Sequence, residues 1–430
     1  MRKYTSDIGE GDVGKEVTLY GWVHEVRDHG GLVFVILRDR EGFIQITLPK
    51  KRVDKEVFRR AKKVRRESVV RVVGVVKAEP KAPGGYEIIP TAFDVLNEAD
   101  APLPLDVAEK VPAELDTRLD HRYLDLRKPK IQAIFRIRHC MLQSIRNFLC
   151  EEGFIEVNTP KIVSTATEGG TELFPISYFE KEAFLNQSPQ LYKQVLMAAG
   201  LEKVFEIGPI FRAEEHNTVR HLNEAVSIDI EVSFTDHEGV MDVLERLIAK
   251  VYEDVSMKCE KYLSWLNAKL DVPETPFERL SYDEAIEMAR KGGEEIPWGE
   301  DLTTPALKIV AEHMDGHYFI VDWPTQSKPF YAMPYDEKPE VCKSFDLMHG
   351  WLELASGAQR IHIYDLLVRR IEECNMSPES FGFYLEAFRY GMPPHAGWGL
   401  GAERLLMSML DLRNIREAVM FPRDRNRLIP

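Results

Sequence analysis

The chain has 430 residues, of which 44% are hydrophobic and 29% charged, as is typical of a soluble globular protein with more than one domain. It contains no apolar run as long as a membrane span and no apolar core of a secretory signal peptide, so we expect no membrane association. The five cysteines lie far apart without a CxxC motif, which argues against a disulfide framework or a zinc site and favours a reducing, cytoplasmic location.

The net charge of −14 is unevenly distributed along the chain. Residues 1–100 hold 19 basic and 16 acidic residues, whereas the remainder is strongly acidic, and residues 50–71 alone carry 11 Lys or Arg. A basic N-terminal module on an acidic body predicts nucleic-acid binding at one end of the chain and different chemistry at the other. A basic helix alone is most often simply a solvated face, which is the alternative interpretation of this run.

Five strand-like runs fill the N-terminal part, with turn sequences between the first three and a basic helix at about 54–66. Five short strands with a helix between the third and the fourth are typical of the OB-fold, a small β-barrel that binds oligonucleotides. Arg27, Phe34 and Gln45 fall where such barrels place stacking and base-reading groups. For Phe34, a place in the apolar core is an equally good interpretation.

Residues 98–130 are rich in Pro, Asp and Leu and show no sustained period. We therefore expect a hinge at 101–130 between a barrel domain at 1–100 and a second domain at 131–430.

The second domain begins with a helical stripe at 131–151 and a short strand that Pro160 ends. A loop of small residues follows and bears Glu168. The next helix places Gln190 and Lys193 on one face, because residues three apart are neighbours on a helix surface.

The most unusual stretch is 204–231, VFEIGPIFRAEEHNTVRHLNEAVSIDIE, in which two β-branched runs surround a polar turn and predict a long antiparallel hairpin. Arg212 and Glu214 share one face of the first strand, because strand side chains alternate. Asp229 and Glu231 share one face of the returning strand in the same way. Such a charged face is costly to bury without a ligand, although a solvated face is the usual explanation of charged strand residues.

Residues 237–320 are the least regular part of the chain, and we expect a helical insertion there. Strand-like runs then place Asp346, Glu353, Ser356 and Arg360 in close succession.

The run GWGLGAERLL carries glycines 397, 399 and 401 just before a helix with Glu403 and Arg404. A Gly-rich turn before a helix can let the backbone approach a phosphate. A dinucleotide fingerprint would need a βαβ unit and a P-loop would need GK[ST], and neither pattern is present. A simple packing turn is the alternative interpretation.

Three motifs in this order resemble the signature motifs of class II aminoacyl-tRNA synthetases: a helix–strand–Pro unit at 131–160, the hairpin at 204–231 and the GAER stretch at 397–410. More narrowly, TEGG, QSPQLYKQ, FRAEEHNTVRHLNEA, ELASGAQR and MPPHAGWGLGAER resemble the compact archaeal type of aspartyl-tRNA synthetase. The resemblance covers nearly the whole chain. It implies an α+β fold with an N-terminal five-stranded OB-fold barrel that binds the anticodon and a catalytic domain whose antiparallel sheet is flanked by helices.

The resemblance also assigns residues to one site. Those that would bind ATP are Arg212, Glu214, Arg220, His221, Leu222, Glu353, Gly401 and Arg404. Those that would bind aspartate are Glu168, Gln190, Lys193, Arg212, Asp229, Ser356 and Arg360. Glu353 and Ser356 would hold Mg2+, and Arg212, Glu353 and Arg404 would act in catalysis.

The chemistry that the resemblance implies, adenylation of an amino acid with ATP, fits this set of residues. A carboxylate is already a nucleophile at pH 7, so no strong protein base and no Ser/His/Asp arrangement is needed. Positioning and charge neutralisation by arginines and a carboxylate-held Mg2+ would dominate. The 3′-terminal hydroxyl of tRNA would then attack the aspartyl-adenylate.

Lys193 distinguishes aspartate from asparagine as the substrate. Asparaginyl-tRNA synthetases resemble this helix but carry an apolar residue there, and the two cations Lys193 and Arg360 suit a carboxylate. An asparaginyl-tRNA synthetase stays open as an alternative, as do a non-catalytic nucleic-acid-binding relative and an amide-forming ligase. The last of these would lack the basic barrel.

His24 and Pro83 resemble the residues of archaeal enzymes that also charge tRNA-Asn, whereas strict enzymes have Trp and Lys there. We therefore expect tRNA-Asp and tRNA-Asn as partners, with strict tRNA-Asp specificity, or simply neutral residues at both positions, as alternatives. Relaxed specificity implies a tRNA-dependent amidotransferase that converts Asp-tRNA-Asn. The first motif of the family implies a homodimer.

Overall fold

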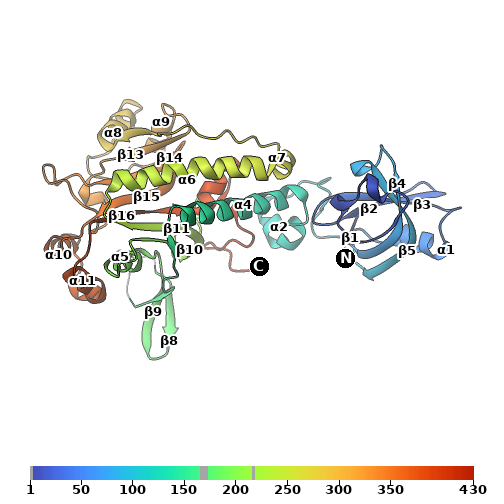
Figure 1. The fold of residues 1–430 in the computed structure, drawn as a ribbon, viewed down its shortest axis with the longest axis horizontal. Coiled ribbons are helices and arrows are strands. Elements are labelled where there is room, and N and C mark those ends of the chain that lie inside the picture. The colour runs from blue at the N-terminus through green and yellow to red at the C-terminus, as the bar shows by residue number, and fades with distance from the viewer. Residues whose placement is uncertain (1–2, 165–172, 216–217) are drawn as a thin grey trace. The chain divides into compact units, whose positions relative to one another are not determined.

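The computed structural model describes residues 3–164, 173–215 and 218–430, which form two compact units, Met1–Pro129 and Lys130–Pro430 (Figure 1). No helix among these residues is both long and apolar enough to cross a membrane.

The first unit is built on a closed five-stranded barrel in the order β1-β2-β3-β5-β4. Its elements are β1 (Glu16–Asp28), β2 (Leu32–Arg38), β3 (Phe43–Pro49), α1 (Lys55–Lys63), β4 (Val69–Ala78) and β5 (Tyr86–Asn97). Val33, Val35 and Leu37 share the barrel core, because alternate side chains of a strand face the same side. The predicted OB-fold, with its helix between the third and the fourth strand, is confirmed.

The stretch 101–130, for which we expected a hinge, contains two short helices, α2 (Leu115–Asp120) and α3 (Arg122–Asp125). The buried carboxylate of Asp125 accepts hydrogen bonds from Arg118 at 3.1 Å and from Arg122 at 2.6 Å. These ionic contacts join the two helices, and each helix also buries one leucine, Leu119 or Leu124. Helices of six and four residues are too short to give a sustained period in the sequence.

The second unit is organised on an eight-stranded sheet in the order β12-β13-β14-β15-β16-β11-β10-β6. The outermost pairs, β12–β13 and β10–β6, are parallel, and the other pairs are antiparallel. The predicted hairpin is confirmed as β10 and β11. The strands are β6 (Ile155–Glu156), β10 (Lys203–Phe211), β11 (Glu224–Ser233), β12 (Glu278–Ser281), β13 (His317–Val321), β14 (Ser344–His349), β15 (Leu352–Arg360) and β16 (His395–Gly401).

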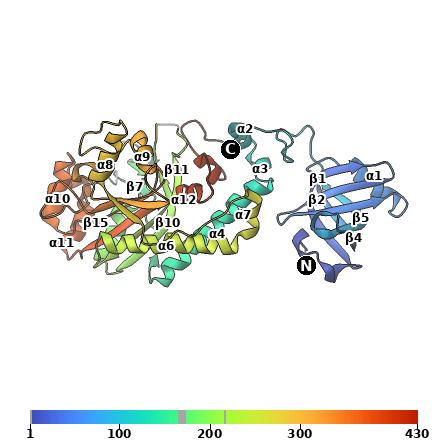
Figure 2. The same cartoon turned by 90° about the horizontal axis from the view of Figure 1, so that it is seen from above.

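Two long helices, α4 (Pro129–Glu151) and α6 (His237–Lys258), run side by side along the sheet (Figures 1 and 2). Met141 of α4 and Val251 of α6 share a hydrophobic core with Ile228 and Ile230 of β11. Because side chains alternate along a strand, the polar residues of β11 face the opposite side of the sheet.

The remaining helices and a small sheet surround this core. The helices are α5 (Gln190–Ala198), α7 (Glu260–Leu266), α8 (Tyr282–Lys291), α9 (Thr304–Ala311), α10 (Tyr364–Glu373), α11 (Gly382–Arg389) and α12 (Ala402–Met409). The small sheet, of order β7-β9-β8, projects beyond α5 in Figure 1. Its strands are β7 (Ile162–Val163), β8 (Pro175–Tyr178) and β9 (Lys181–Leu185).

The stretch 237–320, for which we expected a helical insertion, holds four helices, α6 to α9. It also holds β12 and β13, which belong to the main sheet. Strands of four and five residues are too short to give a clear period in the sequence.

Two buried histidines of the second unit determine part of the pH dependence of stability. Burial lowers the pKa of His317 to about 3 and that of His395 to about 4. Both are therefore neutral in the folded protein, whereas the unfolded chain binds a proton at each below about pH 6.5. The free energy of unfolding should be highest above that pH and fall towards pH 4, by about 1.4 kcal/mol per pH unit for each histidine.

His317→Phe separates one of these contributions, because the ring of His317 already packs against Phe277 and Tyr252. The free energy of unfolding, measured with denaturant between about pH 4.5 and pH 7.5, should depend less steeply on pH in the variant. Below about pH 6.5 the difference in slope should correspond to about one proton. An unchanged slope would contradict a buried, neutral His317.

Candidate active site

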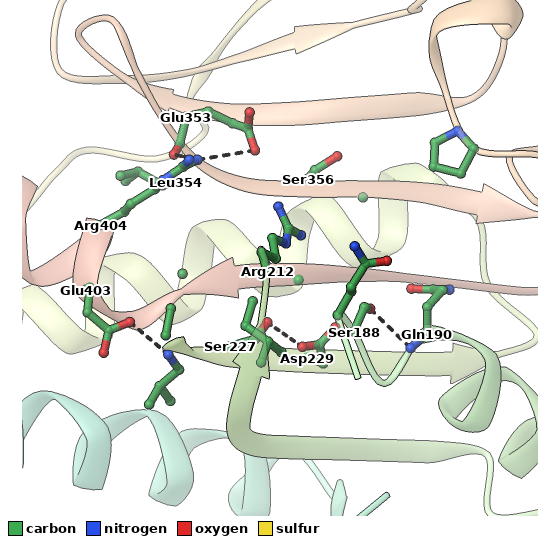
Figure 3. Close-up of a pocket in the computed structure, with 18 of the residues that line it drawn as sticks. Ser188, Gln190, Arg212, Ser227, Asp229, Glu353, Leu354, Ser356, Glu403 and Arg404 are labelled. Atoms are coloured by element: carbon green, nitrogen blue, oxygen red, sulfur yellow. Dashed lines mark hydrogen bonds and ion pairs between the residues drawn. The ribbon is translucent and has the colours of Figure 1, made fainter. Parts of the chain in front are cut away.

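A cleft of about 270 Å3 opens on the face of the main sheet that turns away from α4 and α6. Ser227 and Asp229 line this cleft, whereas Ile228 and Ile230 between and beside them pack into the core. The floor comes from β11, β15 and β16, and one wall comes from the loop after β10 (Figure 3). The hairpin that was unusual in the sequence therefore carries the polar face of the cleft.

The glycines of β16 leave room for acidic side chains of β11. The two strands pair Gly399 with Asp229 and Gly397 with Glu231. A Cβ atom at Gly399 would lie 3.1 Å from Asp229 Oδ1, and one at Gly397 would overlap the carboxylate of Glu231. The expected Gly-rich turn is therefore wrong for these two glycines, because they lie inside a strand, where they leave room for carboxylates.

A cluster of two cations and two carboxylates lies at one end of the cleft, where Asp229 and Arg360 line it. Lys193 Nζ is 2.9 Å from Asp229 Oδ1 and 3.5 Å from Glu231 Oε2. Arg360 Nε donates to Glu231 Oε1 at 3.0 Å. All four side chains are at most 5% exposed, so their charges have to balance one another with little help from water.

Glu231 is the carboxylate that both cations share. Burial opposes its ionisation, but Arg360 and Lys193 hold its pKa below the usual value. Burial also opposes the charge of Arg360, and Glu231 overcomes this effect and raises the pKa of the guanidinium. Arg360 lines the cleft with its guanidinium 5.3 Å from the centre of the Tyr331 ring. A guanidinium has five N–H donors, so Arg360 can bind Glu231 and a ligand carboxylate together.

The other end of the cleft gathers arginines around Glu353 (Figure 3). Arg404 Nη1 donates to the backbone carbonyl of Glu353 at 2.9 Å and lies 3.6 Å from its carboxylate. Removal from water opposes ionisation of Glu353, but Arg404, Lys328 and Arg212 keep its pKa below the usual value. Arg212 projects between the two ends (Figure 3). Several arginines around one carboxylate favour a polyanionic ligand.

The loop after β10 contributes a cation and a neutral ring. Arg220 Nη2 donates to Thr304 Oγ1 at 2.6 Å, and its guanidinium lies 5.5 Å from the centre of the Trp351 ring. His221 Nδ1 lies 2.7 Å from Thr218 Oγ1. Burial and the neighbouring arginines lower the pKa of His221 to about 4. This lowered pKa favours a neutral imidazole at pH 7, which can take part in hydrogen bonds.

Oxygen ligands for a divalent cation come together at Asp346, Glu353 and Ser356. Asp346 and Ser356 are direct partners on β14 and β15, and the buried Oδ1 of Asp346 has no hydrogen-bond partner among the described residues. Mg2+ takes oxygen ligands and usually keeps waters and substrate phosphates beside one or two carboxylates. These residues fit such a site, although the described residues contain no cluster of three or more His, Cys, Asp or Glu side chains that would hold a metal alone.

Lys328 is a cleft residue that the sequence analysis missed. Its Nζ lies 2.7 Å from Asp346 Oδ2 and 3.9 Å from the centre of the Trp323 ring. A lone lysine in the run TQSKPFY matches no motif, so only its position beside Asp346 reveals it. Tyr331, which packs on Arg360, was missed for the same reason.

The cleft brings together most of the residues that the sequence predicted. Those that line it are Gln190, Arg212, Glu214, Arg220, His221, Leu222, Asp229, Glu353, Ser356, Arg360, Gly401 and Arg404. Lys193 does not line the cleft but reaches it through Asp229. Glu168 lies outside the described residues.

The residues predicted to contact tRNA lie on the barrel of the first unit. Arg27 and Phe34 are direct partners in the β1–β2 ladder, and Gln45 lies on the neighbouring β3. Phe34 is half-buried, lies outside the core cluster and has its ring 6.0 Å from that of His29. Phe34 therefore lies at the barrel surface and not in the apolar core.

His24 lies on β1 between an aromatic ring and a cation. Its ring is 5.0 Å from that of Phe43, and its Nδ1 is 3.2 Å from Arg38 Nη1. Burial, and then Arg38, lower the pKa of His24. Arg38 is itself fixed by the buried Glu67, with a shortest distance of 2.7 Å. Pro83 begins the short 3-10 turn before β5.

Comparisons with known proteins support one interpretation of both units. The family described as "tRNA synthetases class II (D, K and N)" matches residues 114–425, and the family described as "OB-fold nucleic acid binding domain" matches residues 17–96. The chain is 76% identical to the aspartate–tRNA(Asp/Asn) ligase of Archaeoglobus fulgidus over the full length of both chains. It is 63% identical to the ligase of that name from Methanoculleus marisnigri, over 96% of each chain.

Solved structures of two kinds are similar to this chain. The asparaginyl-tRNA synthetase of Pyrococcus horikoshii in complex with asparaginyl-adenylate has a TM-score of 0.95 and 35% identity, with full coverage of both chains. The aspartyl-tRNA synthetase of Entamoeba histolytica has a TM-score of 0.88 and 34% identity, and the match covers 100% of this chain and 93% of that one.

Removal of the charge of Glu231 should destabilise the second unit. In Glu231→Gln the two buried cations keep one carboxylate instead of two, and breaking a buried ion pair typically costs about 3–5 kcal/mol. Denaturant unfolding should show a loss of this size.

Adding Lys193→Met to Glu231→Gln removes one cation as well, so the cluster again has one cation for each carboxylate. The double variant should be more stable than the sum of the two single losses predicts. Strictly additive losses would show that Glu231 and Lys193 do not interact.

Proposed function

Because the chain belongs to the class II aminoacyl-tRNA synthetases, we propose that its cleft activates L-aspartate with ATP and that the aspartyl group is then transferred to tRNA. The chain is an aminoacyl-tRNA ligase, and its full-length archaeal relatives are aspartate–tRNA ligases by name. The roles of single residues given below are part of the proposal.

The observation that supports aspartate as the substrate is the pair of cations Arg360 and Lys193. Arg360 lines the cleft and Lys193 reaches it through Asp229, so a side-chain carboxylate would meet the guanidinium of Arg360. Asp229 and Gln190, beside them, suit the substrate ammonium. The neutral amide of asparagine would leave the cations poorly matched, and sites built on such polar contacts reject mismatched substrates strongly.

Asparagine activation is the second candidate function, because the chain is similar to solved synthetases for both amino acids. The overall fold does not separate the two substrates. The cations favour aspartate, because Arg360 lines the cleft and keeps donors beyond its pair with Glu231 that a ligand carboxylate would accept from.

Arg212 lies where aspartate and ATP would meet. The α-carboxylate of aspartate attacks the α-phosphorus of ATP, and the new C–O–P linkage forms as the bond to pyrophosphate breaks. Arg212 would neutralise both the carboxylate and the α-phosphate, while Arg404 and Arg220 would hold the rest of the nucleotide. No proton has to be removed from the nucleophile, and the neutral His221 can contribute a hydrogen bond to the leaving group.

Glu353, Ser356 and Asp346 would hold Mg2+. When bound, this ion supplies positive charge to the triphosphate. Lys328 offsets the charge of Asp346 through their 2.7 Å ion pair, which leaves Glu353 as the more available anionic ligand.

The anticodon of the tRNA would bind to the barrel of the first unit. Its strands carry Phe34, Arg27 and Gln45, and an aromatic ring with neighbouring polar groups is how OB-folds bind single-stranded bases. In the transfer step, the 3′-terminal hydroxyl of the tRNA attacks the carbonyl carbon of the aspartyl-adenylate and AMP leaves.

We propose that both tRNA-Asp and tRNA-Asn are charged. His24 and Pro83 support this relaxed specificity, as do the names of the relatives, which include both tRNAs. Asp-tRNA-Asn would need a tRNA-dependent amidotransferase to become Asn-tRNA-Asn, so such an enzyme is the proposed functional partner. A homodimer, as the first motif of the family implies, is part of the same proposal.

Charging of tRNA-Asp and tRNA-Asn transcripts with labelled aspartate and asparagine, side by side, tests this proposal. We expect aspartate on both tRNAs and asparagine on neither. Asparagine charging would favour the second candidate function, and failure to aspartylate tRNA-Asn would contradict relaxed specificity.

The variant His24→Trp with Pro83→Lys tests the barrel contact in the same assay. It should lower kcat/KM for tRNA-Asn by about tenfold or more and leave tRNA-Asp within about twofold, because one base contact is typically worth ~1–3 kcal/mol. Aspartate-dependent ATP–pyrophosphate exchange is the internal control and should not change, since both substitutions lie in the first unit.

A further inference from the structure

The cleft loop, residues 212–223, carries Arg212, Arg220 and His221, and residues 216–217 of it lie outside the described part. A second segment, residues 415–427, contacts this loop through backbone and side-chain hydrogen bonds. It follows α12 and begins with a short 3-10 helix, Ile415–Ala418. None of the residues predicted from the sequence to bind a substrate lies in this segment.

Backbone hydrogen bonds connect the segment to Arg212. Asn223 N donates to the carbonyl of Arg423 at 2.8 Å, and Ile415 N donates to the carbonyl of Val219 at 2.8 Å. Asn223 in turn accepts from Arg212 N at 3.0 Å and donates through Nδ2 to Arg212 O at 2.9 Å. The backbone of Arg212 is therefore two hydrogen-bonded steps away from Arg423.

A buried arginine connects the same segment to the other two cleft residues of the loop. Arg416 Nη1 donates to the carbonyl of Thr218 at 2.9 Å. Thr218 Oγ1 lies 2.7 Å from His221 Nδ1 and accepts from Arg220 N at 3.3 Å. Arg416 thus fixes the residue that orients both Arg220 and His221.

Asp424 holds this arrangement together. Its Oδ2 accepts from Arg416 Nε at 2.5 Å, and both side chains are 8% exposed. Its Oδ1 accepts from the backbone N–H of Asn426 at 2.8 Å, which folds the turn that follows. From this turn, Arg425 Nη1 donates to the carbonyl of Glu215 at 2.8 Å. Neither Asp424 nor Arg416 is among the described residues that line the cleft.

We propose that Asp424 is a positioning residue, which acts through Arg416 to hold the cleft loop in the conformation that receives ATP. The proposal rests on the proposed function, in which this loop binds the nucleotide. Asp424 and Arg416 hold the loop at Thr218, beside Arg220 and His221. The aspartate end of the cleft is held by α5, β11 and β15 and shares only Arg212 with the loop, so loss of Asp424 should weaken ATP binding much more than aspartate binding. Displacement of catalytic groups by about 1 Å can cost ~10²-fold in rate.

Asp424→Asn tests the proposal in ATP–pyrophosphate exchange with full-length protein. We expect KM for ATP to rise by about tenfold and kcat to fall, while KM for aspartate stays within about twofold. Asp424→Glu, which keeps the charge, should recover part of the loss. Arg425→Met removes the contact with Glu215 at an exposed position and should also raise KM for ATP, by a smaller factor. This variant tests the proposal even if Asp424→Asn does not fold well.

Glu152→Gln is the matched control, because it removes a carboxylate paired with Arg246 at 2.6 Å elsewhere in the second unit. Both KM values should remain those of the parent. An Asp424→Asn protein with unchanged KM for ATP, or with both KM values raised equally, would overturn the positioning role.

Equilibrium binding of ATP in the absence of aspartate separates the two proposals. If the parent protein binds ATP but shows no aspartate-dependent exchange, the proposed function fails. A weaker ATP affinity of Asp424→Asn in that assay would still support the positioning role, and an equal affinity would contradict it.

Discussion

One fully buried carboxylate, that of Glu231, is the constraint on which the rest of the active site depends. It has to neutralise Lys193 from α5 and Arg360 from β15, so three separate elements must meet at one point. Gly397 makes the meeting possible, since any side chain there would occupy the space of the carboxylate. The cations are held by the protein before a substrate arrives, and a site prepared in this way discriminates by charge rather than by shape.

The two faces of β11 connect this constraint to the fold. Ile228 and Ile230 anchor the strand to α4 and α6, and the alternating Ser227 and Asp229 face the cleft as a direct consequence. The same alternation is visible in the sequence, which is why the hairpin and the acidic face of its second strand could be predicted. The prediction that Arg212 and Glu214 share a face of the first strand was wrong, because β10 ends at Phe211 and both residues lie in the loop that follows. The barrel was predictable for a similar reason, because its strands and its helix follow one another in a short, local order.

Features that depend on contacts between distant parts of the chain could not be predicted. Nothing in the sequence indicates that Lys328 lies beside Asp346, or that Gly397 and Gly399 are paired with carboxylates of the neighbouring strand. Phe34 lies in an apolar run without alternation, so its outward direction could not be told from the sequence. The short helices at 115–125 are joined by charges around Asp125, which hydrophobic periodicity does not detect.

Lys193 and Arg360 together should select a substrate with a side-chain carboxylate. ATP–pyrophosphate exchange by Lys193→Leu, with aspartate and asparagine compared under the same conditions, tests this selection. We expect the parent protein to exchange with aspartate only and the variant to lose aspartate-dependent exchange, with its folded structure checked by circular dichroism. Full retention of aspartate-dependent exchange in a folded Lys193→Leu protein would show that Lys193 does not select the substrate.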